Sequence, residues 1–211
     1  MLRPREKIVA LTLDDGPQET NDILLDILKE RNVRATFFMI GENIEKRPEI
    51  VKRAYAEGHD IAWHSYEHKL TAFSTKEYIE ADLKKGIELI EEVTGERPKY
   101  FRAPGGHISE DICITAANYG YRQVEWSNYS FIDKEEHGIP AKERADATFD
   151  AMYGIRSGDI LLAHPRDNME ILEGLGLMID RFHAEGYKVL SLTELFESRS
   201  DGIVICYGPL F

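Results

Sequence analysis

The segment Lys7–Pro17 (KIVALTLDDGP) constrains the fold more than any other part of the sequence. An apolar run from Ile8 to Leu13 ends at two adjacent aspartates, Asp14 and Asp15, which are followed by Gly-Pro. An unbroken apolar run rich in β-branched residues is typical of a strand that is buried on both faces of a parallel sheet. We therefore expect both aspartates at the carboxyl end of a strand, where α/β folds carry their functional groups.

Two neighbouring carboxylates are costly in a closed site unless a cation or hydrogen-bond donors hold them. In an extended strand, neighbouring side chains point to opposite faces. Asp14 and Asp15 can share one site only if the chain changes direction, and we expect the turn at Gly16-Pro17 to do this. The alternative is an ordinary surface turn, because Asp-Gly-Pro is good turn chemistry.

Length and charge limit the kinds of protein this can be. With 211 residues, of which 43% are hydrophobic, the chain can bury a sizeable core, and one domain over residues 1–211 is expected. The formal net charge of −12 argues against a nucleic-acid or anionic-membrane partner. No run of 18 apolar residues is present, so no membrane segment is expected. Cys113 and Cys206 lack metal-site spacing and are expected to be packed thiols.

The location of the protein depends on its termini. The first strand begins too close to Met1 to leave room for a signal peptide. The sequence therefore predicts a cytoplasmic protein if both termini are native, and a cell-envelope or secreted one if an export segment has been removed. The sequence does not fix the oligomeric state.

Strand-like and helix-like segments alternate along the whole chain. The expected strands are Lys7–Pro17, Ala35–Ile40, Asp60–Trp63, Tyr100–Phe101, Tyr121–Trp126, Ile160–Ala163 and Lys188–Leu192. The expected helices are Thr20–Arg31, Pro48–Ala56, Thr75–Val93 capped by Ser74, Ser109–Tyr119, Ala141–Gly154, Met169–Glu185 and a short one from Thr193. This alternation predicts a distorted (β/α)7-type barrel of parallel strands, with an open doubly wound sheet as the alternative. Asn128–Pro140 lacks periodicity and is expected to be a loop that lines the site.

Polar residues follow one expected strand after another. Asp14 and Asp15 follow the first strand, His64 the third, Arg102 the fourth and His164 the sixth. In a barrel of parallel strands these positions all lie on one face. The repeated placement predicts a single site built from several loops.

His64 and His68 are spaced so that two imidazoles can reach one ion from a helical turn or a tight loop. Solvated or core histidines explain most such pairs. Together with Asp15, however, they form a set of two histidines and one carboxylate, which leaves coordination positions open for water or substrate. Open positions are typical of a catalytic metal. The same set of ligands also serves non-haem iron oxygenases, in which Asp14, Arg102 and His164 would have no obvious task.

Four motifs, taken in order, resemble those of the polysaccharide deacetylases, the NodB-homology family (carbohydrate esterase family 4). They are Thr12-Leu-Asp-Asp-Gly-Pro17, His64-Ser-x-x-His68, Arg102-x-Pro104-x-Gly106 and Leu162-x-His164. The resemblance extends from about Lys7 to about Phe196. Four motifs in order at strand ends are far more specific than any one of them.

The resemblance implies a role for each metal-site residue. Asp15, His64 and His68 would be ligands of one divalent metal ion, with zinc favoured and cobalt, nickel or manganese as alternatives. Asp14 would be the general base acting on a metal-bound water, and Arg102 would orient it and keep it ionised.

The resemblance also implies the acid and the substrate-binding residues. His164 would be the general acid that protonates the departing amine. Trp126 and Leu162 would wall the pocket for the acetyl methyl. Pro104 and Gly105 would line the substrate site, and a backbone N–H near Gly105 would help to hold the oxyanion.

The implied function is that of a metal-dependent hydrolase of linear amides. It would remove N-acetyl groups from an N-acetylglucosamine-type saccharide that is peptidoglycan-like or chitin-like, so a carbohydrate is the expected partner. One alternative is a hydrolase of the same fold that acts on a small non-polymeric amide. Another is a non-catalytic carbohydrate-binding relic, which should have lost a ligand or the base, and neither is lost here.

The sequence departs from the usual family pattern at several positions. Leu13 replaces a common Phe, Gly105 stands where an aromatic residue is frequent, and Pro165 replaces the Asp that usually follows the catalytic histidine. The segment Trp126–Asp133 only loosely matches the motif whose aspartate partners His164. Asp133 is the first candidate for that partner and Asp167 the second. No role is assigned to four histidines: His59, His107, His137 and His183.

Overall fold

The computed structural model describes residues 6–130, 132, 139–150 and 154–198. The strands are β1 (Ile8–Gly16), β2 (Thr36–Met39), β3 (Asp60–Trp63), β4 (Tyr100–Phe101), β5 (Arg122–Gln123), β6 (Asn128–Tyr129), β7 (Asp159–Ala163) and β8 (Lys188–Leu190). The helices are α1 (Asn21–Glu30), α2 (Gly41–Lys46), α3 (Pro48–Ala56), α4 (Lys76–Thr94), α5 (Glu110–Asn118), α6 (Ala141–Phe149), α7 (Met169–Ala184) and α8 (Leu192–Ser198). A short 3₁₀ turn covers Pro104–Gly106.

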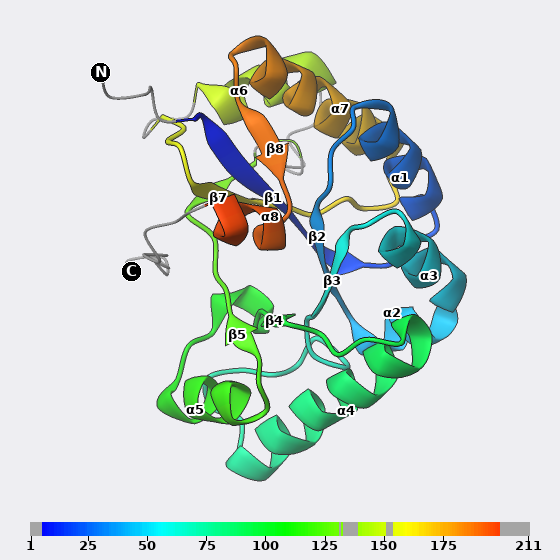
Figure 1. Cartoon of the computed structure of the whole chain (residues 1–211), viewed down its shortest axis with the longest axis vertical. Helices are drawn as coiled ribbons and strands as arrows, with labels where there is room; N and C mark the ends of the chain where they lie inside the picture. The colour runs from blue at the N-terminus through cyan, green and yellow to red at the C-terminus, as the bar shows by residue number, and fades with distance from the viewer. Residues whose placement is uncertain (1–5, 131, 133–138, 151–153, 199–211) are drawn as a thin grey trace.

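The described strands form one curled sheet with β1 near its middle. The order is β5-β4-β3-β2-β1-β7-β6, with β8 also paired to β1, and the pairings are all parallel. The helices from α6 through α7, α1 and α3 to α4 form an arc around the outside of this sheet (Figure 1). The predicted distorted barrel of parallel strands is therefore confirmed. Since β5 and β6 are edge strands and do not pair in the described residues, the barrel is open there.

Both faces of β1 are buried, as its apolar run predicts. Val9, Leu11 and Leu13 pack into the layer between the sheet and the outer helices. Ile8 and Ala10 face a smaller cluster inside the curl of the sheet, which also contains Phe38, Ala62, Tyr100, Trp126 and Leu162. Each parallel pairing brings another carboxyl end alongside that of β1. This packing gathers the residues that follow the strands at one end of the sheet.

One edge of β1 is shared by two strands. Ile8–Ala10 pair with β8, whereas Thr12–Gly16 pair with β2. Because β7 occupies the other edge, through Val9–Leu13, β8 and β2 must follow one another along the same edge and diverge from it. The sheet therefore forks at the amino-terminal end of β1.

The differences from the expected elements are small and local. Residues 128–129, expected in a loop, form β6 against Leu161 and Leu162 of β7, so the described residues contain eight strands rather than seven. Helix α2 was not expected, because six residues are too few to show a periodicity. Helix α4 is capped by Thr75, whose hydroxyl accepts from the Tyr78 N–H, and not by Ser74. Cys113 is an exposed free thiol rather than a packed one, and Cys206 lies outside the described residues.

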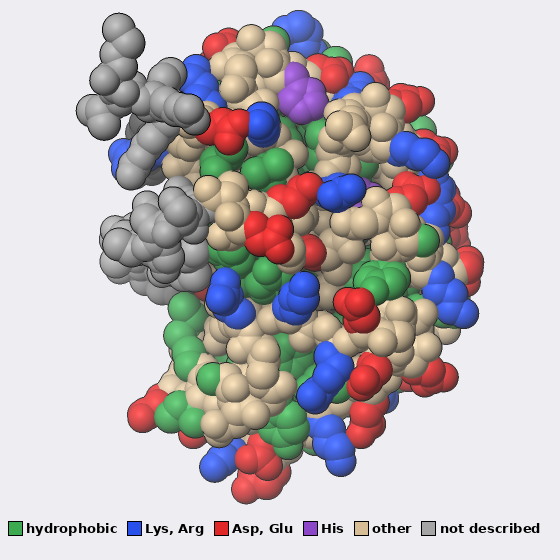
Figure 2. All heavy atoms as spheres, in the orientation of Figure 1, with side chains coloured by type: hydrophobic (Ala, Val, Ile, Leu, Met, Phe, Trp, Pro, Cys, Tyr) green, Lys and Arg blue, Asp and Glu red, His purple; other side chains and the backbone are tan. Residues whose placement is uncertain are grey.

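The surface carries no large single-sign region in the view of Figure 2, where basic and acidic side chains alternate. None of the helices in the described part of the chain is long and apolar enough to cross a membrane.

The contact between α4 and the sheet gives a first testable prediction. A Cβ atom added to Gly86 of α4 would lie 2.4 Å from Cδ2 of Trp63, whose side chain is fully buried. Alanine normally stabilises a helix interior relative to glycine by about 1 kcal/mol. Here overpacking should dominate, so Gly86→Ala is expected to lower the free energy of unfolding in urea by about 1–3 kcal/mol.

Gly174→Ala on α7 is the matched control for this prediction. A Cβ atom at Gly174 would meet Ile132 at an ordinary 3.4 Å, so this substitution should be neutral or stabilising. If Gly86→Ala stabilised the protein as much as Gly174→Ala, the close packing of α4 on Trp63 would be wrong.

Candidate active site

A bulge at the end of β1 lets two adjacent aspartates face the same site. The pairing register of β1 with β2 shifts between Asp14 and Gly16, which makes Asp15 the extra residue, and its φ is 72°. Asn43 of α2 donates to the Asp15 carbonyl oxygen at 3.0 Å and holds the bulge. The expected change of direction is therefore present, but it occurs at Asp15 rather than at the Gly16-Pro17 turn, because β1 continues through Gly16.

A tight loop after β3 carries the two histidines. Ser65 and His68 both have positive φ, at 66° and 58°, so the loop is not a helical turn. Asp82 of α4 fixes the loop, since its carboxylate accepts from the Trp63 indole N–H and from the Tyr66 backbone N–H, each at 2.8 Å. The two imidazole rings are thereby held edge to face, with their centroids 5.0 Å apart.

The chemistry of the three predicted ligands fits a divalent metal ion. One donor atom from each of Asp15, His64 and His68 lies within 4.8 Å of the other two. Oδ1 of Asp15 is buried without a hydrogen-bond partner of its own, and its neighbours are Nε2 of His68 at 3.2 Å and Nε2 of His64 at 3.6 Å. Nδ1 of His64 lies 2.8 Å from the Arg102 carbonyl oxygen, to which its N–H can donate. That contact leaves Nε2 free to bind a metal, as second-shell partners of ligating histidines usually do.

The protonation of these three groups also suits a ligand set. Burial would raise the pKa of Asp15, but the imidazole of His68 beside it and the charges of His64 and His164 lower that pKa below its ordinary value. Burial lowers the pKa of His64, which favours the neutral ring that metals bind. Contact with Asp15 raises the pKa of the more exposed His68. Metal binding at His68 therefore competes with protonation of the ring more strongly than metal binding at His64 does.

Arg102 holds Asp14 in place beside the metal ligands. Its guanidinium is fully buried and donates to Oδ1 of Asp14 at 2.7 Å and to the Thr12 hydroxyl at 2.9 Å. It also donates to the carbonyl oxygens of Val124 and Glu125, which connect β5 to β6. Arg102 thus lies inside the curl of the sheet and links the β5–β6 connection to β1. The other oxygen of Asp14, Oδ2, lies 3.6 Å from Nε2 of His64 and faces the site.

His164 is placed by β7 directly after the strand ends. It is partly exposed, and it is near enough to lower the pKa values of both Asp15 and His68. The structure therefore brings together at one end of the sheet every residue that the sequence predicts as ligand, base, orienting residue or acid.

Comparisons with known proteins agree with this arrangement. A family model described as polysaccharide deacetylase matches residues 2–124. The peptidoglycan-N-acetylglucosamine deacetylase of Bacillus cereus is 34% identical over 193 residues, which cover 90% of this chain and 88% of the relative. The chain belongs to the polysaccharide deacetylase family.

Solved structures show the same fold in this family. The structure named T48 deacetylase with substrate superposes with a TM-score of 0.81 at 30% identity, covering 92% of this chain and 93% of that one. BA3943 of Bacillus anthracis, described as a CE4 family pseudoenzyme, has a TM-score of 0.80 at 26% identity, with 93% and 67% covered. The fold alone therefore does not decide activity in the polysaccharide deacetylases, and the side chains of the site must.

The residues predicted to contact the substrate differ in their burial and in their neighbours. Trp126 and Leu162 are buried in the same cluster inside the curl of the sheet. Gly106 has φ 69° and lets the Trp126 ring pack closely, because a Cβ atom there would be 2.7 Å from the ring. Pro104 is buried, whereas Gly105 is exposed, and a Cβ atom on Gly105 would touch only His107, at 3.7 Å. The exposed turn therefore carries no side chain at Gly105, the position where the family resemblance implies an aromatic residue.

Of the two candidate partners of His164, the structure describes only Asp167. Asp133 lies outside the described residues. Oδ1 of Asp167 accepts from both the backbone N–H and the hydroxyl of Thr20, each at 2.9 Å, so this carboxylate is already engaged with the start of α1. His137 also lies outside the described residues.

Sequence reasoning missed three residues that support the site. Asn43 holds the Asp15 bulge and Asp82 holds the histidine loop. Glu125 is a buried carboxyl beside Arg102, and burial raises its pKa. Polar and acidic residues in helices and loops are usually solvent-exposed, so only the contacts reveal the roles of Asn43 and Glu125. The one available signal was Asp82 itself, which falls on the apolar face of α4 between Ile79 and Leu83.

Proposed function

We propose that this polysaccharide deacetylase is a metal-dependent hydrolase that removes N-acetyl groups from an N-acetylglucosamine-type saccharide. The observation that carries the proposal is the complete set of Asp15, His64 and His68 beside the Arg102-held carboxylate of Asp14. Zinc is the favoured metal, since a two-histidine, one-carboxylate set with open positions is typical of catalytic zinc. When bound, such an ion acts as a Lewis acid that polarises the acetyl carbonyl.

The protein groups can perform the remaining steps of amide hydrolysis. Asp14, held by the Arg102 guanidinium, accepts the proton of the water that attacks the acetyl carbonyl carbon. When the carbon–nitrogen bond breaks, His164 gives a proton to the amine nitrogen, so that a free amine and acetate leave. Leu162 and Trp126 bury the acetyl methyl group, and the turn at Pro104–Gly106 presents backbone to the substrate.

Support for the saccharide comes from the relatives and from the chain itself. The relative from Bacillus cereus is named as a deacetylase of peptidoglycan N-acetylglucosamine. The sequence has no Gly-rich phosphate cradle, which makes a phosphorylated substrate a poor fit. A peptidoglycan-like or chitin-like chain is therefore the proposed substrate.

Metal removal and acetate release test this proposal together. We expect purified protein to contain about one equivalent of divalent metal, and to release acetate from N-acetylglucosamine oligomers. Chelation should abolish the release, and zinc or cobalt should restore it. Metal content is measured by mass spectrometry of the dialysed protein, and acetate by an enzyme-coupled assay. Lys84→Gln, an exposed change on α4, is the control for nonspecific effects.

The other outcomes identify the competing functions. Metal-loaded protein that binds the oligomers without releasing acetate would indicate a carbohydrate-binding relic; BA3943, a protein of the same fold, is described as a pseudoenzyme. Activity on formamides or other small amides, with none on sugars, would indicate a different substrate branch. Redox-active iron would indicate an oxygenase.

A further inference from the structure

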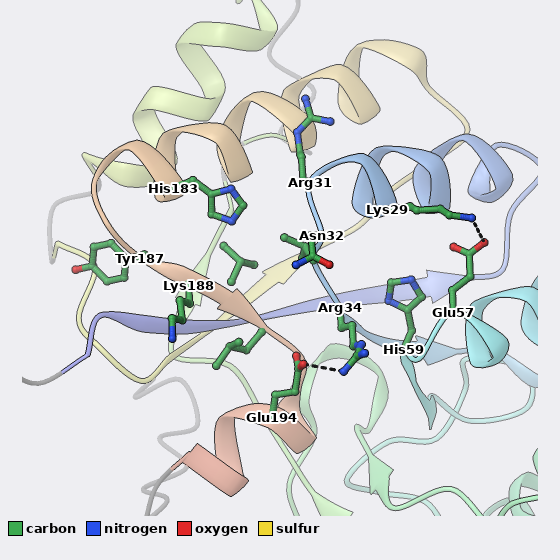
Figure 3. Close-up of a pocket in the computed structure, with 13 residues that line it drawn as sticks. Lys29, Arg31, Asn32, Arg34, Glu57, His59, His183, Tyr187, Lys188 and Glu194 are labelled. Atoms are coloured by element: carbon green, nitrogen blue, oxygen red, sulfur yellow. Dashed lines mark hydrogen bonds and ion pairs between the residues drawn. The ribbon is translucent and has the colours of Figure 1, made fainter.

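The charged side chains that line the cavity at the fork of the sheet are balanced. This cavity has a volume of about 620 Å³ and lies at the amino-terminal ends of the strands, where His59 is part of its lining (Figure 3). Each of its cations is paired with a carboxylate, in the pairs Lys29–Glu57, Arg31–Asp180, Arg34–Glu194 and Lys188–Glu6. A side chain without an assigned role lies instead at the opposite end of the sheet, beside the predicted active site.

That residue is Tyr129, an aromatic residue that the proposed mechanism does not use. It belongs to β6, an edge strand of the sheet, and it is 50% exposed. Single exposed aromatic residues are common on protein surfaces, so exposure alone indicates no function. The position of Tyr129 on the sheet is the observation that relates it to the site.

The register of the sheet places Tyr129 on the inner face, in one row with residues of the site. Tyr129 pairs with Leu162 of β7, and Leu162 pairs with Thr12 of β1. Paired residues of neighbouring strands point to the same face of a sheet, because successive residues alternate between the faces. Leu162 belongs to the cluster inside the curl of the sheet. The side chain of Tyr129 therefore also points to the inside of the curl.

The proposed base and acid follow this row by two residues. Asp14 comes two residues after Thr12 on β1, and His164 comes two residues after Leu162, directly past the end of β7. Two residues advance a strand by about 7 Å and return the side chain to the same face. A saccharide with its acetyl group between Asp14 and His164 can therefore reach Tyr129 with a neighbouring ring.

Ring contacts connect Tyr129 to the same group of residues. Its ring meets that of Trp126 edge to face, with the centroids 5.2 Å apart. Cζ of Arg102, which holds Asp14, lies 5.4 Å from the centre of the Trp126 ring. Trp126 is only 8% exposed, so it supports the Tyr129 ring from the interior. Tyr129 thus offers a fixed and accessible aromatic surface beside the predicted acetyl pocket.

The turn at Pro104–Gly106 does not offer such a surface. Gly106 packs its backbone against the Trp126 ring, and the exposed Gly105 has no side chain. Tyr129 therefore supplies an aromatic surface next to Trp126 that this turn does not.

We propose that Tyr129 is a substrate-binding residue whose ring stacks on a pyranose ring of the saccharide, next to the unit that loses its acetyl group. Aromatic side chains bury a large apolar area in binding sites, and the C–H groups on one face of a pyranose ring can pack against them. The inference rests on the proposed function, because it assumes that the acetyl group lies between Asp14 and His164. It makes Tyr129 a residue that selects oligosaccharides over single sugars.

Binding measured without turnover tests this assignment. The N-acetylglucosamine tetramer is titrated by calorimetry into the metal-loaded full chain that carries Asp14→Asn. Adding Tyr129→Ala should raise the Kd roughly ten-fold, because one ring face is no longer buried on binding. Tyr129→Phe keeps the ring and should leave the Kd nearly unchanged. In the enzyme with Asp14 intact, Tyr129→Ala should lower kcat/KM for acetate release from the tetramer by a similar factor, and much less from the monomer.

The matched control is Tyr55→Ala. Tyr55 is a partly exposed tyrosine beside a small cavity at the amino-terminal end of β3, so its loss should leave the Kd unchanged. An unchanged Kd in Tyr129→Ala, or no binding of the tetramer at all, would overturn the assignment. An equal loss in Tyr129→Phe would also overturn it, since the hydroxyl rather than the ring would then bind the sugar.

The same data separate this assignment from the proposed function. A tetramer that binds in a Tyr129-dependent way, but from which the enzyme with Asp14 intact releases no acetate, would overturn the proposed function and support the stacking role. Release of acetate with an unchanged Kd in Tyr129→Ala would overturn the stacking role alone.

Discussion

Asp14→Asn is expected to lower kcat by roughly 10²–10⁴ while the metal content and the substrate affinity stay unchanged. The amide keeps the size of the carboxylate and can still contact Arg102, but it cannot accept a proton from the attacking water. Oδ1 of Asp14 is the oxygen that Arg102 holds, so the loss falls on Oδ2, which faces the site. Steady-state rates of acetate release and metal analysis of the same preparation measure the two quantities.

The neighbouring variant Asp15→Asn provides the matched contrast. Its carboxylate lies against both histidines, so the substitution should weaken metal binding, and excess zinc should partly restore the rate. His64→Ala should lose metal and activity together. If excess metal rescued Asp14→Asn but not Asp15→Asn, the roles of the two aspartates would have to be exchanged. Two chemically identical residues can differ in this way because the bulge gives them different surroundings.

The parts of the fold that depend on long apolar patterns were predictable from the sequence. Strand β1, which contains Asp14, is buried on both faces, and α3 has the expected bounds, because burial and helix-end signals act locally. The placement of His64, Arg102 and His164 followed from the same pattern, since parallel strands put their carboxyl ends on one side. The expected topology was therefore sufficient to predict that these residues lie together, without knowledge of any side-chain contact.

The remaining features depend on contacts that a sequence does not display. Strand β6 has only two residues, which is too short for a strand periodicity, and it is recognised only by its pairing with β7. The bulge at Asp15 rests on a hydrogen bond from Asn43, which is 28 residues away. His59 was assigned no role, because its position in a cavity arises from the fork between β8 and β2 and not from any neighbouring residue. Short elements and long-range polar contacts set the limit of prediction here.

Arg102→Met is expected to lower the free energy of unfolding by about 3–5 kcal/mol, a typical cost of breaking a buried ion pair. The guanidinium is 0% exposed and makes four hydrogen bonds, and its partner Asp14 is only 2% exposed. Methionine fills much of the volume, but it leaves the Asp14 carboxylate in the interior without its cation. Urea unfolding monitored by tryptophan fluorescence measures the loss.

The matched control is Arg144→Met on α6. Arg144 is also buried, but its carboxylate partner Glu170 is 77% exposed. Arg144→Met therefore leaves no buried carboxylate without its cation, and it should lower the free energy of unfolding less than Arg102→Met does. The double variant Asp14→Asn/Arg102→Met separates the two contributions to the loss. Because the asparagine carries no charge, the double variant should be more stable than Arg102→Met alone, which is a coupling that independent sites do not show. Equal losses for the two arginines, with no recovery in the double variant, would mean that Arg102 acts only through its backbone contacts and not as the partner of Asp14.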